Sequence, residues 1–151
     1  MSASPLRIAV IADTHDRFPE SVACEIATAN EIWHLGDVCS SATLEQVEKL
    51  GPPLFVVRGN NDFFQTWPME ITLTRQGMSF LLIHIPPAPS KLGTTDFLLH
   101  GHTHIPRDET ISEIRILNPG AVGKANKGSP PSYAWLTIAP DDTIDWKIVL
   151  I

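Results

Sequence analysis

The first third of the chain alternates short apolar runs with segments in which apolar residues recur at helical spacing. The apolar runs, typical of strands buried on both faces, occupy 6–12, 31–35 and 54–57. The segments with helical spacing occupy 20–29 and 42–50, and Gly51 ends the second of them. This β-α-β-α-β order predicts parallel strands joined by helical crossovers.

The pattern changes after residue 70, where strand-like segments follow one another across turns and Pro-rich loops. These segments occupy 71–75, 78–84, 96–100, 111–117, 133–138 and 143–151. The Gln76–Gly77 turn predicts a hairpin between the first two segments, and antiparallel strands are expected to dominate this part. We therefore expect one α/β (α+β) domain, residues 1–151, in which two sheets pack face to face with helices outside.

Composition narrows the class of protein. The chain has 151 residues, of which 43% are apolar and 19% charged, as in an ordinary soluble globular protein. The net charge is −6 and no run of Lys or Arg occurs, which argues against a broad duplex-binding face. A small anionic substrate remains compatible with this composition.

The two cysteines, Cys24 and Cys39, show no CxxC spacing, so neither a disulfide scaffold nor a thiolate zinc site is expected. Both are expected to be small buried residues in a reducing compartment. The N-terminal segment lacks the pattern of a signal peptide, and no apolar stretch approaches the length of a membrane span. A cytoplasmic protein without membrane contact is therefore expected.

Polar residues capable of binding metal follow five of the expected strands. They are Asp13 and His15, Asp37, Asn60, His84, and finally His102 and His104. In open α/β sheets, ligands bind at the carboxyl ends of the strands, so these side chains are expected to converge on one rim. Carboxylate, imidazole and amide ligands suit Mn, Fe, Zn, Co or Ni. Seven ligands suit two ions better than one, with a carboxylate such as that of Asp37 bridging them.

Simpler interpretations exist for single residues. His34 taken alone is better explained as a packed histidine than as a ligand. Asp62 can cap a helix or close a turn, and Arg58 can form a surface ion pair. These interpretations fail jointly for the seven residues, because solvated loops do not explain ligand types at five strand ends.

Four motifs and one strand-terminal histidine then carry a resemblance to a family. They are DTH at 13–15, GD at 36–37, GNxD at 59–62, His84, and GHTH at 101–104. In this order they resemble the calcineurin-like metallophosphoesterases. NPG at 118–120 and SYAWL at 132–136 resemble the small bacterial and archaeal phosphodiesterase branch of that family. The resemblance implies a four-layer αββα sandwich with two divalent ions, Mn being favoured, and hydrolysis of a small phosphodiester by a bridging hydroxide.

The resemblance also implies roles for individual residues. It implies one ion held by Asp13, His15, Asp37 and His104, and a second held by Asp37, Asn60, His84 and His102. Asp37, Asn60 and His102 are then expected to be catalytic, and Asn60, Asn61 and Arg58 to bind substrate. Asp62 is expected to orient a ligand histidine.

Three departures from the family pattern stand out. Asn61 replaces a common histidine that is usually assigned to leaving-group protonation, which points toward phosphodiester hydrolysis. Asp16 stands where glycine is common. Ile85 follows His84 in place of glycine, and the Pro-rich segment up to His102 shows no helical pattern where the family usually has a helix. This edge of the site is therefore expected to be more open.

Two other functions fit the same motifs. One is a protein-binding scaffold, because a retromer subunit of this family serves mainly in protein interaction. The other is a phosphomonoesterase. Completeness of the ligand set favours an enzyme, since a scaffold can lose ligands freely. Apolar residues of the 71–84 hairpin would also suit a face for homo-oligomer formation.

Overall fold

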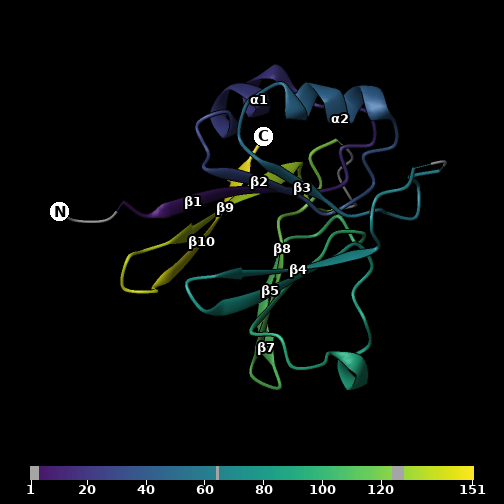
Figure 1. The fold of residues 1–151 in the computed structure, drawn as a ribbon. Coiled ribbons are helices and arrows are strands. Elements are labelled where there is room, and N and C mark those ends of the chain that lie inside the picture. Colours follow the sequence, from purple (N-terminus) through teal and green to yellow (C-terminus); the bar gives the residue numbers. More distant parts are fainter. Residues whose placement is uncertain (1–3, 64, 124–127) are drawn as a thin grey trace.

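The computed structural model describes residues 4–63, 65–123 and 128–151. In it, two five-stranded mixed sheets pack face to face, and the helices cover the outer face of one sheet (Figure 1). The expected pair of packed sheets is confirmed. Over the second sheet, the helical layer is reduced to one 3-10 turn, Pro89–Lys91.

The first sheet contains the β-α-β-α-β unit. Its strands, in the order β10-β9-β1-β2-β3, are β10 (Ile144–Leu150), β9 (Ser132–Ile138), β1 (Leu6–Ile11), β2 (Glu31–His34) and β3 (Leu54–Val56). Its helices are α1 (Glu20–Ile26) and α2 (Ser41–Glu48). Strands β1, β2 and β3 are parallel, as predicted, while β9 and β10 join antiparallel at the β1 edge.

The second sheet is built from the later strands. Their order is β4 (Glu70–Arg75), β5 (Met78–Ile83), β6 (Phe97–Leu99), β8 (Ile114–Asn118) and β7 (Arg107–Ile111). The β4–β5 hairpin was predicted, and it is antiparallel. Strands β5, β6 and β8 nevertheless run parallel, so this half of the fold is mixed.

The segment 111–117 was predicted as one strand, and this prediction is wrong. The chain reverses at Ser112 and Glu113, where φ is 50° and 68°, and strands β7 and β8 form a hairpin around them. Tight hairpin turns with two positive φ values usually carry Asn-Gly or a similar pair. Ser-Glu gives no such signal, so the alternation of apolar and polar residues over 111–117 predicted one continuous strand.

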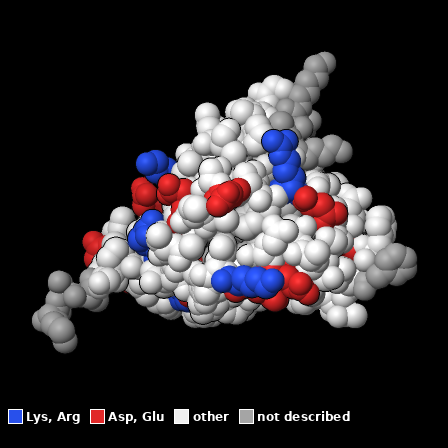
Figure 2. Space-filling model, turned by 90° about the horizontal axis from the view of Figure 1, so that it is seen from above, with Lys and Arg blue, Asp and Glu red and all other residues white. Residues whose placement is uncertain are grey.

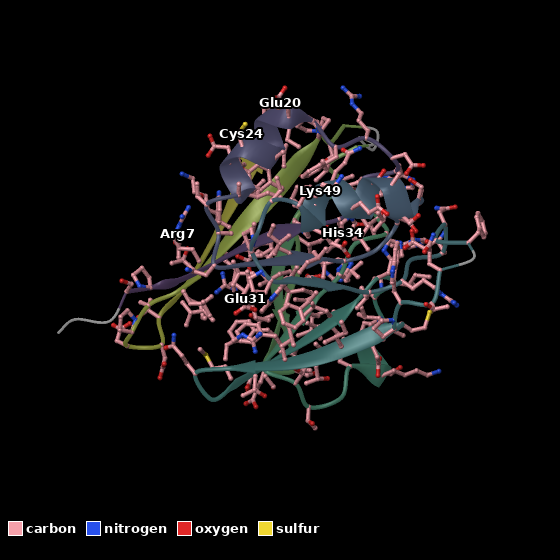
Figure 3. All side chains as sticks on the ribbon, turned by 45° about the horizontal axis from the view of Figure 1, so that its top comes forward. Arg7, Glu20, Cys24, Glu31, His34 and Lys49 are labelled. Atoms are coloured by element: carbon pink, nitrogen blue, oxygen red, sulfur yellow. The ribbon has the colours of Figure 1, made fainter. Side chains whose placement is uncertain are left out.

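Two apolar clusters fix the first sheet in place. Between the sheets, Trp33 meets Phe80 edge-on at 5.4 Å between ring centroids. On the other face, Val22 and Ile26 of α1 pack over the strands. Cys24 lies on the opposite side of α1 and is exposed (Figure 3), which corrects the expectation of a buried thiol. Both cysteines are free.

Basic and acidic side chains are interspersed on the helix-covered side of the molecule (Figure 2). This pattern produces no continuous cationic surface on that face. Among the described residues, no helix has the length and apolar character needed to cross a membrane.

Candidate metal centre

The seven residues expected at the rim lie together at one edge of the two sheets. Each follows the carboxyl end of a strand: Asp13 and His15 follow β1, Asp37 follows β2, Asn60 follows β3, His84 follows β5, and His102 and His104 follow β6. Because the two sheets face each other, the loops of both contribute side chains to the same space. The parallel strands therefore account for the meeting of residues far apart in sequence.

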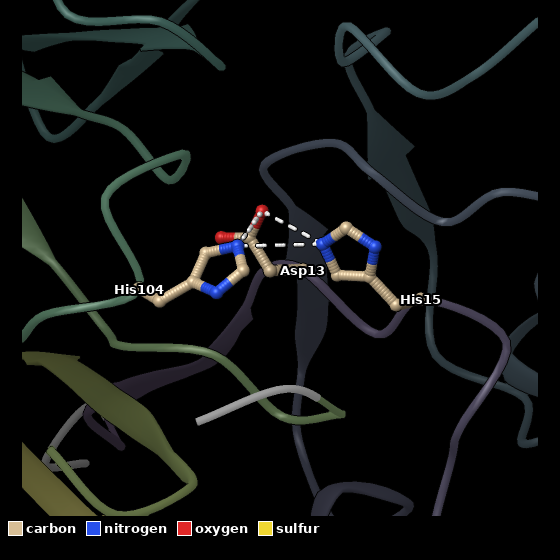
Figure 4. Close-up of side chains that lie close together, drawn as sticks. All are labelled: Asp13, His15 and His104. Atoms are coloured by element: carbon tan, nitrogen blue, oxygen red, sulfur yellow. Dashed lines mark hydrogen bonds and ion pairs between the residues drawn. The ribbon is translucent and has the colours of Figure 1, made fainter. Parts of the chain in front are cut away.

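Asp13, His15 and His104 form a first group (Figure 4). The Nε2 atoms of His15 and His104 lie 3.3 Å apart, and Asp13 Oδ1 lies 3.3 Å from His104 Nε2 and 3.7 Å from His15 Nε2. Two atoms that bind one ion at about 2.1 Å are separated by about 3.0–3.4 Å. The spacing in this group is therefore close to that of a metal site.

His84 is the centre of a second group. Its Nε2 lies 3.0 Å from Asn60 Oδ1 and 3.3 Å from Asp37 Oδ2. His102 joins through Nδ1, which is 3.1 Å from the same Asn60 oxygen. The His84 Nδ1–H donates to the carbonyl of Leu35 at 2.7 Å, which leaves Nε2 directed into the group.

The Asp37 carboxylate connects the two groups. Its Oδ2 lies 3.5 Å from His15 Nε2 and 3.3 Å from His84 Nε2. Burial acts to raise the pKa of Asp37, but hydrogen bonds from His84 and from Asn61 outweigh burial and hold the pKa well below its usual range. Asp37 is therefore ionised and faces both groups through one oxygen.

Asp13 carries a buried oxygen that lacks a hydrogen-bond partner among the described residues. Its Oδ2 accepts from the backbone N–H of His102 at 3.1 Å, whereas the buried Oδ1 accepts no hydrogen bond. Burial acts to raise the pKa of Asp13, but the nearby imidazoles of His104 and His15 lower it overall. An ionised, buried oxygen without a partner is costly, and a cation bound there would satisfy it. The mixed oxygen and nitrogen donors thus fit divalent metal ions.

The backbone at the rim is held in an uncommon conformation. Asp13, His15, Asp37, His102 and His104 all have positive φ, between 46° and 73°. Non-glycine residues seldom adopt this region, and clusters of such residues occur at functional sites. The fold therefore holds these side chains in position at a conformational cost.

Asp62 supports the centre through the backbone. Its carboxylate accepts from the N–H groups of Gly59 at 2.6 Å, Cys39 at 2.7 Å and Asp37 at 2.9 Å. The expectation that Asp62 orients a ligand histidine is therefore corrected: it fixes the loop that carries Asp37. Gly59 is required beside it, since a Cβ at that position would overlap Asp37.

Asn61 and Asp16 explain two of the sequence departures. Asn61 donates from its backbone N–H to Asp37 Oδ1 at 2.8 Å and from its side chain to Asp37 Oδ2 at 2.9 Å. Asp16, also with positive φ, accepts from Ser40 and Thr43 at the start of α2. Asp16 therefore links the loop after β1 to the helix that follows Asp37.

His34 lies in the interior of the molecule, as the simpler interpretation expected (Figure 3). Its Nδ1 accepts from the Gly36 N–H at 3.1 Å, so Nε2 carries the proton and faces Thr14 Oγ1 at 3.2 Å. Burial lowers the pKa of His34 to about 3. The imidazole is therefore neutral in the folded protein.

Acidification is expected to destabilise the protein through His34. Between pH 6.5 and about 3, His34 gains a proton in the unfolded chain but not in the folded chain. The free energy of unfolding therefore decreases as the pH is lowered through this range. From pH 7.5 to 5.0, metal-free wild type should lose about 2 kcal/mol more of its free energy of unfolding than His34→Gln. Urea denaturation at both pH values measures this difference. Equal losses in the two proteins would show that His34 is not the buried neutral group responsible for this pH dependence.

His100 was not singled out from the sequence, yet it shapes the loop of His102. Its Nδ1–H donates to the Gly101 carbonyl at 2.8 Å, and its Nε2 accepts from Arg107 at 3.1 Å. Asn118 donates to the same carbonyl at 3.3 Å. Asn118 belongs to the NPG motif, which is the one sequence signal for this network. The local pattern gives no other signal, because it does not distinguish His100 from the strand before it.

The sequence offers four cations as possible substrate contacts, Arg58, Arg107, Lys124 and Lys127, although a solvated surface position is the simpler expectation for each. Arg58 donates to the Gln65 carbonyl at 3.2 Å, close to Asn60. Arg107 is engaged with His100 and Glu109. Lys124 and Lys127, considered for the same role, lie outside the described residues. Among the described candidates, Arg58 is therefore the one that lies beside the centre.

Comparison with known proteins identifies relatives of the whole arrangement. The family model of the calcineurin-like phosphoesterase superfamily domain matches residues 6–141. A probable metallophosphoesterase of Methanocaldococcus jannaschii is 31% identical, covering 95% of this chain and 81% of the relative. A phosphodiesterase of the same organism is 25% identical, covering 76% and 83%.

Solved structures share the fold. A novel archaeal phosphodiesterase superimposes with a TM-score of 0.80 at 20% identity, covering 96% of this chain and 99% of the other. Vacuolar Protein Sorting 29 from Cryptosporidium parvum gives 0.78 at 18% identity, covering 97% and 98%. At these identities, the likeness concerns the fold alone.

Proposed function

Because the chain belongs to the calcineurin-like phosphoesterase superfamily, we propose that it hydrolyses small phosphodiesters at a dinuclear metal centre. The observation that carries the proposal is the pair of ionised carboxylates at the rim. Asp13 offers a buried oxygen that accepts no hydrogen bond from the described residues, and Asp37 directs one oxygen at both histidine groups. The oxygen and nitrogen donors suit Mn, Fe, Zn, Co or Ni, and among these we propose manganese on the family resemblance.

The proposed ligands divide as the two groups do. Asp13, His15 and His104 would hold one ion, and Asn60, His84 and His102 the other. Asp37 would be shared between them. When bound, two such ions supply a nucleophile from water near neutral pH and neutralise charge on the phosphoryl oxygens.

The charges at the rim favour an anionic substrate. Two divalent ions would exceed the charge of the two carboxylates, Asp13 and Asp37, so the loaded centre would be locally positive in an acidic protein. Asn60 is exposed at the mouth of the centre, where its amide can reach a phosphoryl oxygen. Asn61 holds Asp37 in place and keeps it ionised.

The side chain of Asn61 has no proton that it can transfer near neutral pH. Leaving groups that depart without protonation should therefore react fastest. An activated diester such as bis-p-nitrophenyl phosphate is the appropriate first substrate, and p-nitrophenyl phosphate is the matched monoester. A faster rate on the monoester would favour the phosphomonoesterase alternative.

Removal of metal is expected to abolish turnover, and manganese to restore it. Protein stripped with a chelator should show no release of p-nitrophenolate from bis-p-nitrophenyl phosphate above background. Addition of Mn should restore release, with Mg and Zn as comparisons. If metal-replete protein hydrolyses neither ester, the scaffold alternative becomes the better account of this fold.

A further inference from the structure

A cavity of about 360 Å³ opens beside the second group of the metal centre. Asn60 and His84 form part of its wall, so the cavity is continuous with the proposed position of the substrate phosphate. Its volume lies at the small end of the range for small-molecule sites. A ligand held at Asn60 would therefore reach directly into it.

The rest of the wall is mainly apolar. Phe63, Met69, Ile83 and Ile85 line it, together with Arg58. Phe63 is 66% exposed, Met69 56% and Ile85 46%. Half of the large hydrophobic side chains that are exposed in the described part of the chain thus gather at this one cavity. Apolar side chains gathered at a surface indicate a binding site.

Building on the proposed function, we propose that this cavity seats an apolar aromatic ester group of the phosphodiester. The phosphate would lie at Asn60 and His84, and the ring would be covered by Met69 and Ile85. The Arg58 guanidinium is planar and can stack on an aromatic face. Besides Asn60 and His84 of the centre, the polar side chains of this wall are Arg58 and Asp62, and the Asp62 carboxylate already accepts from three backbone N–H groups.

A matched pair of ligands tests the proposal without turnover. Dimethylphosphinate and methyl(phenyl)phosphinate are both monoanions without an ester bond, and they differ only in that a phenyl group replaces one methyl group. Calorimetry with manganese-loaded protein should show at least about tenfold tighter binding of the phenyl ligand. In methyl-labelled protein loaded with zinc, which lacks the paramagnetic broadening of manganese, the ring should shift the NMR signals of Met69, Ile83 and Ile85 and leave that of Ile144 in place.

Exposed cavity residues can be changed with little risk to folding. Met69→Ala and Phe63→Ala should each reduce the phenyl preference several-fold. Leu150→Ala is the control, because Leu150 is 64% exposed and lies on β10 away from the cavity. It should retain the preference of the wild type.

Three results would overturn the proposal. They are equal affinity for the two ligands, a preference that survives both cavity substitutions, and a dimer whose interface covers Met69 in sedimentation and labelling experiments. Turnover of bis-p-nitrophenyl phosphate without a phenyl preference would reject the cavity and keep the proposed function. A phenyl preference that depends on Met69, in a protein without turnover, would keep the cavity and reject the proposed function.

Discussion

Replacing Asp37 with alanine is expected to lower kcat/KM for bis-p-nitrophenyl phosphate by about a thousandfold or more. Asp37 Oδ2 faces both His15 and His84, at 3.5 Å and 3.3 Å from their Nε2 atoms. Its loss would remove one ligand from each ion together with half of the negative charge that attracts them. Both the number of bound ions and the rate should therefore fall.

Steady-state rates and metal content of the same preparation measure this effect. Asp145→Ala is the matched control, because Asp145 is an exposed aspartate on β10. It should keep the wild-type rate and metal content. A loss of less than tenfold in Asp37→Ala would show that Asp37 does not bridge two catalytic ions.

Replacing Asp62 with alanine is expected to lower the free energy of unfolding by about 3–5 kcal/mol. Three backbone N–H groups, those of Asp37, Cys39 and Gly59, would lose their acceptor in a buried loop. Urea denaturation of metal-free protein measures the loss without a contribution from bound ions. Asp145→Ala again serves as control, with an expected change below about 0.5 kcal/mol.

The Asp62 substitution also distinguishes a residue that holds the Asp37 loop in place from a residue that binds the metal itself. Asp62→Ala should weaken manganese binding, since the loop of Asp37 would lose its anchor. Saturating manganese should then restore part of the activity, which it should not do for Asp37→Ala. A decrease in stability below 1 kcal/mol would contradict the role assigned to the three amides.

The sequence predicted the first sheet well because its periodicity is unambiguous. Continuous apolar runs give β1, β2 and β3, and helical spacing at Val22 and Ile26 gives the face of α1 that packs on them. The β7–β8 hairpin escaped prediction because Ser112 and Glu113 form a turn that usually requires glycine or asparagine. Tertiary packing overrides local preference there.

At the centre, the sequence located the residues at strand ends but not their supports. A strand end identifies Asp13 or His84 because a parallel sheet brings such ends to one rim. Backbone contacts, such as that of Leu35 with His84, carry no residue signature. The network around His100 likewise depends on where Arg107 returns to the loop, which only the folded chain defines.

Anomalous scattering at the manganese edge, from crystals grown with manganese, tests the dinuclear centre most directly. The account predicts two peaks per chain, one between Asp13, His15 and His104 and one between Asn60, His84 and His102, with Asp37 touching both. No peak at these residues, or one peak that leaves either histidine group without an ion, would contradict it.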